Sequence, residues 1–244
     1  MLGVAIVCLL NLPMNVEGLG ARERPIPAGI VDKFNLFPNV GAMLVVVVPN
    51  DFGIPEGILA FCSGTLIHER VFLTAGHCTG PSSFAPLPPF IQVFVTLAPT
   101  LLAEPVRGIR PAALGSPDVL ESPAATRRPM LFVGYGFREL SPEGEILAVS
   151  EWDGWRRIHA SRMERVVDDT WAWWTLPSQV CFGDSGGPRF LQKDPLGGPF
   201  DLALVAVASD GGIDCLSRDD RARVDTSADQ QWITGRIQDF LSRE

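Results

Sequence analysis

The sequence predicts an all-β protein that ends in a single α-helix. Short apolar runs rich in β-branched and aromatic residues indicate strands, and the 24 Gly and 21 Pro residues supply frequent turns between them. A helical spacing of apolar residues is convincing only near the C-terminus. These observations favour a body made of β-sheets over a helical bundle or an alternating α/β fold.

Six segments carry the strand signal most clearly, and proline-dense loops such as 81–89 separate some of them. In chain order the predicted strands are Met43–Val48, Ile58–Ile67, Val71–Ala75, Phe90–Leu97, Met130–Val133 and Leu202–Ala208.

The final helix is predicted over about 228–242, with Ser227 as its N-cap. Five apolar side chains fall on one face of such a helix and would cover the β-structure. They are Trp232, Ile233, Ile237, Phe240 and Leu241.

Size and charge restrict the class of protein. A chain of 244 residues suits one domain or a two-lobed unit, and 46% hydrophobic residues give a globular composition. The net charge of −8 disfavours binding to phosphate backbones, so we expect no nucleic-acid partner. No apolar run of roughly 18 residues predicts a membrane-spanning helix.

The N-terminus and the cysteines together indicate an exported protein. The apolar stretch Leu2–Leu12 is followed by small residues, and we interpret 1–21 as a signal sequence. Its removal would take Cys8 and leave four cysteines, an even number suited to disulfides in a secreted, extracellular protein. Four cysteines allow three pairings.

Two motifs carry the chemistry. One is Gly183-Asp184-Ser185-Gly186-Gly187-Pro188, and the other is Thr74-Ala75-Gly76-His77-Cys78. A serine hydroxyl attacks a carbonyl only if an imidazole accepts its proton and backbone N–H groups hold the oxyanion that forms. Together with the strand pair Cys62–Ile67 and Val71–Ala75, these motifs resemble the chymotrypsin/trypsin-like family of serine peptidases.

This resemblance implies a fold of two antiparallel β-barrels with the active site between them. It assigns 30–115 to a first lobe that carries His77 and 116–244 to a second lobe that carries Ser185. The implied disulfides are Cys62–Cys78, beside the histidine, and Cys181–Cys215, beside the substrate pocket.

The resemblance also implies a role for each site residue. Ser185 would be the nucleophile and His77 the general base, with the N–H groups of Gly183 and Ser185 as oxyanion hole. Gln179 would lie at the base of the specificity pocket, and Ser209 and Gly211 would bind extended substrate. We expect the partner to be a polypeptide substrate. We also expect the protein to be a monomer without metal or cofactor.

Two further assignments concern activation. By the same resemblance Asp184 would pair with a new α-amino group after cleavage, and Ile30 would be that new N-terminus. Neither Gly29 nor Asp32 beside Ile30-Val31 fits the usual cleavage context well.

The acid of the catalytic triad is missing from its expected place. Ser185 follows His77 by 108 residues, whereas in chymotrypsin the separation is about 138. Thr96 stands where the acid is expected, and we place a deletion between Leu97 and Leu101 that also removes a strand of the first barrel. Asp118 is the only aspartate between His77 and Asp153, and we interpret it as a solvated turn residue.

Three functions are therefore compared. The first is a serine endopeptidase, and the second is a catalytically impaired homologue that binds peptides. The third is an α/β-hydrolase esterase, because Gly183-x-Ser185-x-Gly187 also fits that nucleophile pattern. Chain order excludes the esterase, since that fold requires a histidine after the serine and none follows Ser185.

Overall fold

The computed structural model describes ten segments of the chain. These are residues 4–8, 29–49, 51, 57–79, 91–100, 108–136, 153–174, 180–194, 201–211 and 219–243. Within them, only the backbone is described for 4–8, 59, 210–211 and 219–220.

The first half of the described chain forms an open, antiparallel, five-stranded sheet. Its spatial order is β1 (Val4–Cys8), β5 (Val71–Ala75), β4 (Gly57–His68), β3 (Val40–Val47) and β6 (Ile91–Thr96). β1 and β6 are its two edges, so this sheet does not close into a barrel. The sequence predicted an incomplete first barrel, and the structure has an open sheet in its place.

The second half forms a closed barrel of six strands, because the last strand of the series pairs back onto the first. Around the barrel the order is β10 (Trp171–Trp174), β13 (Asp219–Arg223), β12 (Leu202–Gly211), β11 (Pro188–Gln192), β8 (Pro129–Gly134) and β9 (Arg157–Val166). Closure leaves these strands without the free edge that an open sheet exposes.

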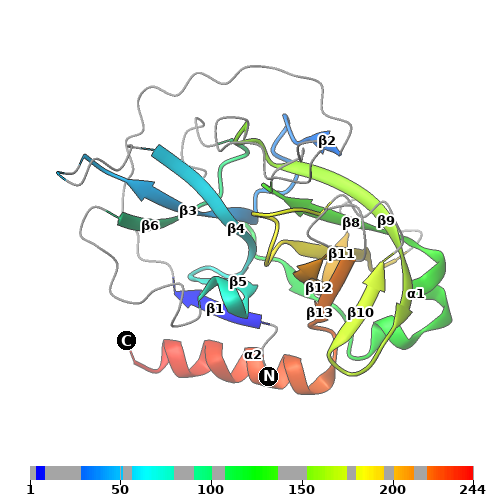
Figure 1. Cartoon of the computed structure of the whole chain (residues 1–244). Coiled ribbons are helices and arrows are strands. Elements are labelled where there is room, and N and C mark those ends of the chain that lie inside the picture. Colours follow the sequence, from blue (N-terminus) through cyan, green and yellow to red (C-terminus); the bar gives the residue numbers. More distant parts are fainter. Residues whose placement is uncertain are drawn as a thin grey trace.

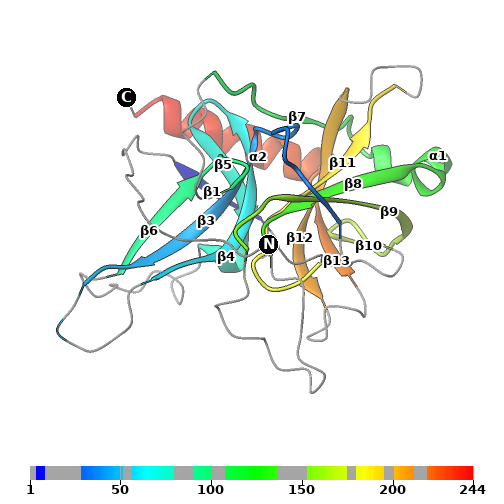
Figure 2. The ribbon, with the colours of Figure 1, turned by 90° about the horizontal axis from the view of Figure 1, so that it is seen from above.

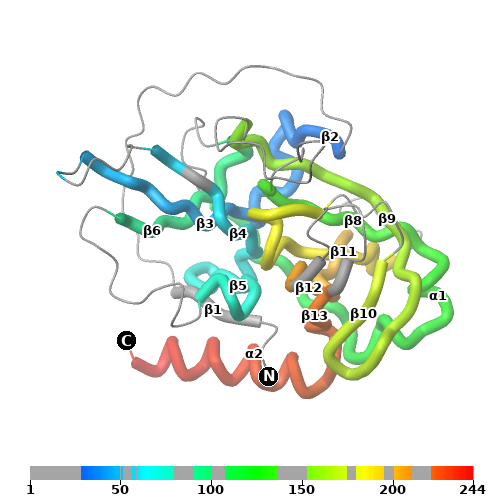
Figure 3. The backbone as a smooth tube through the Cα atoms, viewed as in Figure 1, coloured from blue at the N-terminus to red at the C-terminus, as the bar shows by residue number. Residues whose placement is uncertain are grey.

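Two short strands extend this second sheet. β2 (Ile30–Val31) pairs with β9, although it belongs to the segment assigned by sequence to the first lobe. β7 (Ala113–Leu114) pairs in parallel with β12. The tube in Figure 3 shows the blue β2 lying next to β9, apart from the strands that follow it in sequence.

The helices are few. η1 (Gly76–Cys78) and η2 (Val119–Glu121) are single 3₁₀ turns, and α1 (Pro123–Arg127) is one short helix. α2 (Ser227–Leu241) is the predicted C-terminal helix. Its N-cap is Thr226 and not Ser227, because the Thr226 hydroxyl accepts a hydrogen bond from the Asp229 N–H at 3.1 Å.

Figures 1 and 2 show the two sheets side by side, with α2 running along the molecule past β1. β1 covers the edge of β5, the strand that leads to His77, and it consists of residues within the expected signal sequence. Across the described residues, no helix is long and apolar enough to span a membrane.

Apolar side chains form three buried clusters. The largest joins both sheets, and it contains Leu44 and Leu73 from the first together with Val133 and Val207 from the second. A second cluster contains Trp174 and other residues of the barrel strands, and a third contains Cys62 and Cys78. The largest cluster joins the two sheets through buried apolar side chains of both.

Candidate active site

The hairpin of β4 and β5 positions His77. All five residues of β5 are buried, and the chain then turns tightly through η1, so Ala75 and Cys78 stay in the core. His77 lies between them on the exposed side of the turn. A rigid, buried strand followed by one 3₁₀ turn thus presents the imidazole at the surface.

A disulfide fastens this turn to the sheet. Cys62 of β4 is bonded to Cys78 of η1 across a separation of 16 residues, which confirms the predicted pairing. In the loop-entropy model a bond of this span contributes about 3 kcal/mol. Because Cys78 follows His77 directly, the bond also restricts where the imidazole can lie.

Glycines shape the loop around Ser185. Gly183 and Gly186 have φ values of +88° and +82°, a region that other residues rarely adopt. The loop is closed by two backbone bonds, from the Asp184 N–H to the Cys181 carbonyl at 3.0 Å and from the Gly187 N–H to the Asp184 carbonyl at 2.8 Å. Ser185 is half-buried at the top of this turn.

The Asp184 carboxylate is buried beneath the loop. It accepts hydrogen bonds from the N–H of Gly136 at 2.7 Å and from the N–H of Cys181 at 3.1 Å. A Cβ at Gly134 or Gly136 would overlap this carboxylate, which explains the glycines on either side of Tyr135. In the intact chain Ile30 is an exposed residue of β2 and not a chain terminus.

The expected oxyanion donors are the N–H groups of Gly183 and Ser185. Within the described part of the chain, neither donates a hydrogen bond to a backbone carbonyl. Every other described N–H of the loop from Cys181 to Gly187, apart from that of Phe182, is used within the protein. Among the described residues, the N–H groups of Phe182, Gly183 and Ser185 therefore have no backbone acceptor.

Ser63 of β4 joins the Ser185 loop to the first sheet. Its N–H donates to the carbonyl of Ser185 at 2.7 Å, and its hydroxyl donates to the carbonyl of Gly183 at 2.9 Å. The same hydroxyl accepts from the Tyr135 N–H at 3.1 Å, and the Ser63 carbonyl accepts from the Thr74 hydroxyl at 2.7 Å. Ser63 lies within the predicted strand Ile58–Ile67, and the sequence predicted no role for it.

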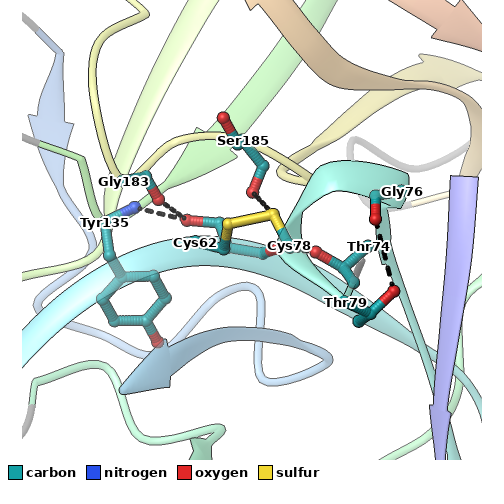
Figure 4. The surroundings of a disulfide bond; sticks show 9 residues. Cys62, Thr74, Gly76, Cys78, Thr79, Tyr135, Gly183 and Ser185 are labelled. Atoms are coloured by element: carbon teal, nitrogen blue, oxygen red, sulfur yellow. Dashed lines mark hydrogen bonds between the residues drawn. A yellow bond between two sulfur atoms is a disulfide. The ribbon is translucent and has the colours of Figure 1, made fainter. Parts of the chain in front are cut away.

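His77 and Ser185 both adjoin the sulfur of Cys78. A ring nitrogen of His77 lies within 4.8 Å of the Sγ atoms of both Cys62 and Cys78. The carbonyl oxygen of Ser185 lies 3.8 Å from the Cys78 Sγ, as Figure 4 illustrates.

The segment expected to bind extended substrate lies beside this loop. The Gly186 N–H donates to the Ala208 carbonyl at 2.7 Å, and the Ala208 N–H donates to the Gly187 carbonyl at 2.9 Å. Past Ala208, β12 continues through Ser209 to Gly211 with β13 on one side only among the described strands.

Two positions bear on the missing acid. Thr96 stands where the acid is expected, and Asp118 is the aspartate that the sequence analysis interpreted as a solvated turn residue. Thr96 ends β6, and its hydroxyl accepts a hydrogen bond from the Ala98 N–H at 3.3 Å. Asp118 is an exposed turn residue with φ +56°, and its N–H donates to the Asp225 carbonyl at 2.8 Å. These contacts tie Asp118 to the end of β13 and the start of α2.

Two predicted residues lie outside the described residues. They are Gln179, expected in the specificity pocket, and Cys215, expected to pair with Cys181. Cys181 itself is disulfide-bonded.

A buried polar network includes the carbonyl of Ala98, which lies between Leu97 and Leu101, where the sequence predicted a deletion. Arg156 is fully buried, and its guanidinium lies 2.7 Å from the Asp32 carboxylate and 2.8 Å from the Val40 carbonyl. The Tyr135 hydroxyl donates to the Ala98 carbonyl at 2.5 Å. Burial raises the pKa of Tyr135 to about 12, while the nearby Arg156 cation opposes part of that rise.

Comparison with known proteins adds no family name. No family model matches the chain, and no curated protein matches its sequence. The fold defines an all-β protein with one closed six-stranded barrel, a second open sheet and a C-terminal helix. This architecture is compatible with a trypsin-like fold.

Proposed function

We propose that the chain is an exported, trypsin-like serine endopeptidase. In this proposal the Ser185 hydroxyl attacks a peptide carbonyl and passes its proton to His77, which then protonates the departing amine. The resulting acyl-enzyme is hydrolysed by water. The observation that carries the proposal is that a His77 ring nitrogen and the Ser185 carbonyl oxygen both lie close to one sulfur, that of Cys78.

The backbone around the serine supports the same chemistry. An oxyanion needs preorganised donors that are not already used within the protein. The N–H groups of Gly183 and Ser185 have no backbone acceptor among the described residues, and Ser63 bonds the carbonyl oxygens of the same two residues. Removal of one such donor typically lowers turnover about 10²- to 10³-fold.

The proposed substrate is an extended polypeptide. The side of β12 from Ser209 to Gly211 that faces away from β13 would pair with its backbone, as an added strand. The net charge of −8 argues against a nucleic acid. We propose that the protein acts outside the cell as a monomer.

A second candidate is a catalytically impaired homologue that binds peptides without cleaving them. Thr96, which stands where the acid is expected, favours it. In chymotrypsin, conversion of the acid to an amide lowers turnover about 10⁴-fold, because the histidine is no longer held in the required tautomer.

A fluorophosphonate probe distinguishes the two candidates. If the peptidase proposal is correct, the probe labels Ser185, and mass spectrometry of the digested protein locates the adduct on that residue. Ser185→Ala should abolish labelling, whereas Ser116→Ala, at an exposed serine, should leave it unchanged. No labelling of a folded protein with intact disulfides would favour the peptide-binding homologue.

The role of Asp118 is tested separately. Because its contacts are with Asp225, we expect Asp118→Ala to change the labelling rate and peptide hydrolysis little. A loss near a thousandfold would show that Asp118 supplies the missing acid.

A further inference from the structure

The most concentrated group of potential metal ligands in the described part of the chain consists of Cys62, His77 and Cys78. One atom from each, namely two sulfurs and a ring nitrogen, lies within 4.8 Å of the others. In the present structure both sulfurs belong to the disulfide, and a disulfide sulfur is not a thiolate ligand. The chemistry of the group therefore depends on its oxidation state.

We propose that opening this disulfide creates a zinc site formed by Cys62, Cys78 and His77. A dithiol reductant gives two electrons and two protons to the disulfide and is itself oxidised to a disulfide. The sulfur–sulfur bond breaks and two thiols form. Zn²⁺ then binds the two thiolates and the neutral imidazole, and the two thiol protons pass to solvent.

The geometry suits this ion. Zinc–sulfur and zinc–nitrogen bonds of about 2.3 and 2.0 Å place the ligand atoms of a tetrahedral site roughly 3.5 Å apart. The three atoms already lie within 4.8 Å, and the 6.2 Å between the Cα atoms of Cys62 and Cys78 lets the sulfurs separate by small rotations of their side chains. Two cysteines, one histidine and a water are a ligand set that zinc uses in proteins.

The surroundings of the group favour the metal over two free thiolates. Both cysteines are buried, with 2% and 1% of their surface exposed, and they pack against apolar side chains such as Met43 and Phe72. A thiolate is costly to bury there, and a divalent cation neutralises two of them at once. His77 lies on the exposed side of the group, so an ion and its fourth ligand, a water, could enter from solvent.

The disulfide and the metal thus compete for the same two sulfur atoms. The proposal concerns the reduced chain and does not depend on peptidase activity, since it is tested by metal binding. If His77 is also a general base, an ion bound to its ring would compete with proton transfer for the same imidazole.

Cobalt(II) is a suitable spectroscopic probe for this site. The full chain is reduced with a dithiol, separated from it without oxygen, and titrated with Co²⁺ and then with Zn²⁺. We expect one equivalent of tetrahedral Co²⁺ with thiolate charge-transfer absorption, displaced by one equivalent of Zn²⁺. The oxidised chain should give no such spectrum.

Three variants make the assignment specific. Cys62→Ser/Cys78→Ser retains Cys8, Cys181 and Cys215, so it reports any metal bound by the other cysteines. His77→Ala should lower the affinity at least about 100-fold, since loss of even an outer-shell partner costs about 10- to 100-fold. His68→Ala, at a histidine on β4, should leave the affinity unchanged.

The outcomes that overturn the proposal are equally definite. Equal metal binding by the reduced protein and by Cys62→Ser/Cys78→Ser would remove the cysteines as ligands, and equal affinity of His77→Ala would remove the histidine. Near-ultraviolet circular dichroism of the six tryptophans reports the tertiary structure. If the reduced, zinc-loaded chain lacks the native spectrum, the site described here is not formed.

Discussion

The backbone N–H of Ser63 donates a hydrogen bond of 2.7 Å to the carbonyl oxygen of Ser185. Ser63 belongs to β4 of the first sheet, and Ser185 belongs to the loop that leads into the second. The bond therefore crosses between the two sheets at the proposed nucleophile itself. Together with the contact of the Ser63 hydroxyl to Gly183, it makes the loop geometry depend on both halves of the molecule.

Ser63→Ala should weaken both stability and reactivity. The substitution keeps the N–H but removes the hydroxyl that bonds Gly183 and Tyr135, leaving two buried backbone groups unsatisfied. We expect a loss of about 1–3 kcal/mol in the free energy of unfolding, measured by urea denaturation. Because the Gly183 peptide is then less constrained, fluorophosphonate labelling of Ser185 should slow by about tenfold or more.

Ser116→Ala is the matched control for that substitution. Ser116 is exposed, so the same chemical change should alter stability by less than about 0.5 kcal/mol and leave labelling unchanged. Labelling by Ser63→Ala at the wild-type rate would show that the hydroxyl does not shape the oxyanion donors.

Two glycine substitutions should have opposite effects. Gly186 has φ +82°, and a Cβ there would overlap the Thr74 hydroxyl and the Ser63 carbonyl, so Gly186→Ala should destabilise the protein by several kcal/mol. Gly235 lies within α2 with no atom near its Cβ position, so Gly235→Ala should stabilise by about 0.5–1 kcal/mol. Thermal and urea unfolding measure both. A neutral Gly186→Ala would mean that the loop is not held against Thr74.

Tyr135 is the single tyrosine of the chain, so its ionisation can be followed by absorbance without interference. Burial raises its pKa to about 12, above the ordinary value near 10, with Arg156 partly offsetting the shift. We expect a titration midpoint near 12 in the native protein and near 10 in urea. A native midpoint near 10 would contradict a buried hydroxyl.

The same shift makes stability depend on pH. The folded pKa exceeds the unfolded value, so between about pH 10 and 12 the native state binds more protons than the unfolded chain. The contribution of Tyr135 is therefore complete below pH 10 and is lost as pH rises toward 12, to a total of about 3 kcal/mol. Tyr135→Phe should remove this part of the pH dependence of unfolding.

Much of the fold could be predicted because hydrophobic pattern and local geometry agree. All six predicted strands are confirmed within a few residues, and β5 matches residue for residue. These are the strands with runs of Val, Ile, Leu and Phe, which pack on the shared core. The C-terminal helix is confirmed, with its start moved by one residue to the cap at Thr226.

β13 could not be predicted, because Asp-Asp-Arg-Ala-Arg resembles a solvated charged segment. Arg221 and Arg223 are nevertheless buried. The Arg221 guanidinium carbon lies 4.5 Å from the ring centroid of Phe132, and Arg223 forms a salt bridge with Glu121 at 2.5 Å. Both partners come from distant segments, and a strand's own residues do not reveal them.

The candidate site was predictable where the chemistry is local. The Ser185 loop and the His77 turn were identified from contiguous motifs, and the Cys62–Cys78 bond is confirmed. The role of Ser63 was missed because it depends on contacts with residues more than 70 positions away, including Gly183. A serine between Cys62 and Gly64 carries no local signal of that role.

The buried ion pair of Asp32 and Arg156 provides the last prediction. Both side chains are fully buried 2.7 Å apart, and Asp32 also accepts the N–H of Leu36 at 2.7 Å. Arg156→Met leaves an unpaired buried carboxylate, so it should cost about 3–5 kcal/mol. Arg156→Met/Asp32→Asn should cost clearly less than the two single substitutions added together, because it leaves no lone charge.

A double-mutant cycle by urea denaturation measures this coupling, and the exposed pair Arg236–Asp239 on α2 is the control. Those two side chains are 55% and 59% exposed, so their coupling should be about 0–1 kcal/mol and should fall further in salt. The coupling between Arg156 and Asp32 should exceed it and persist in salt, because burial excludes the screening ions. Additive costs for Arg156→Met and Asp32→Asn would show that the N-terminal segment is not held to the second sheet through this ion pair.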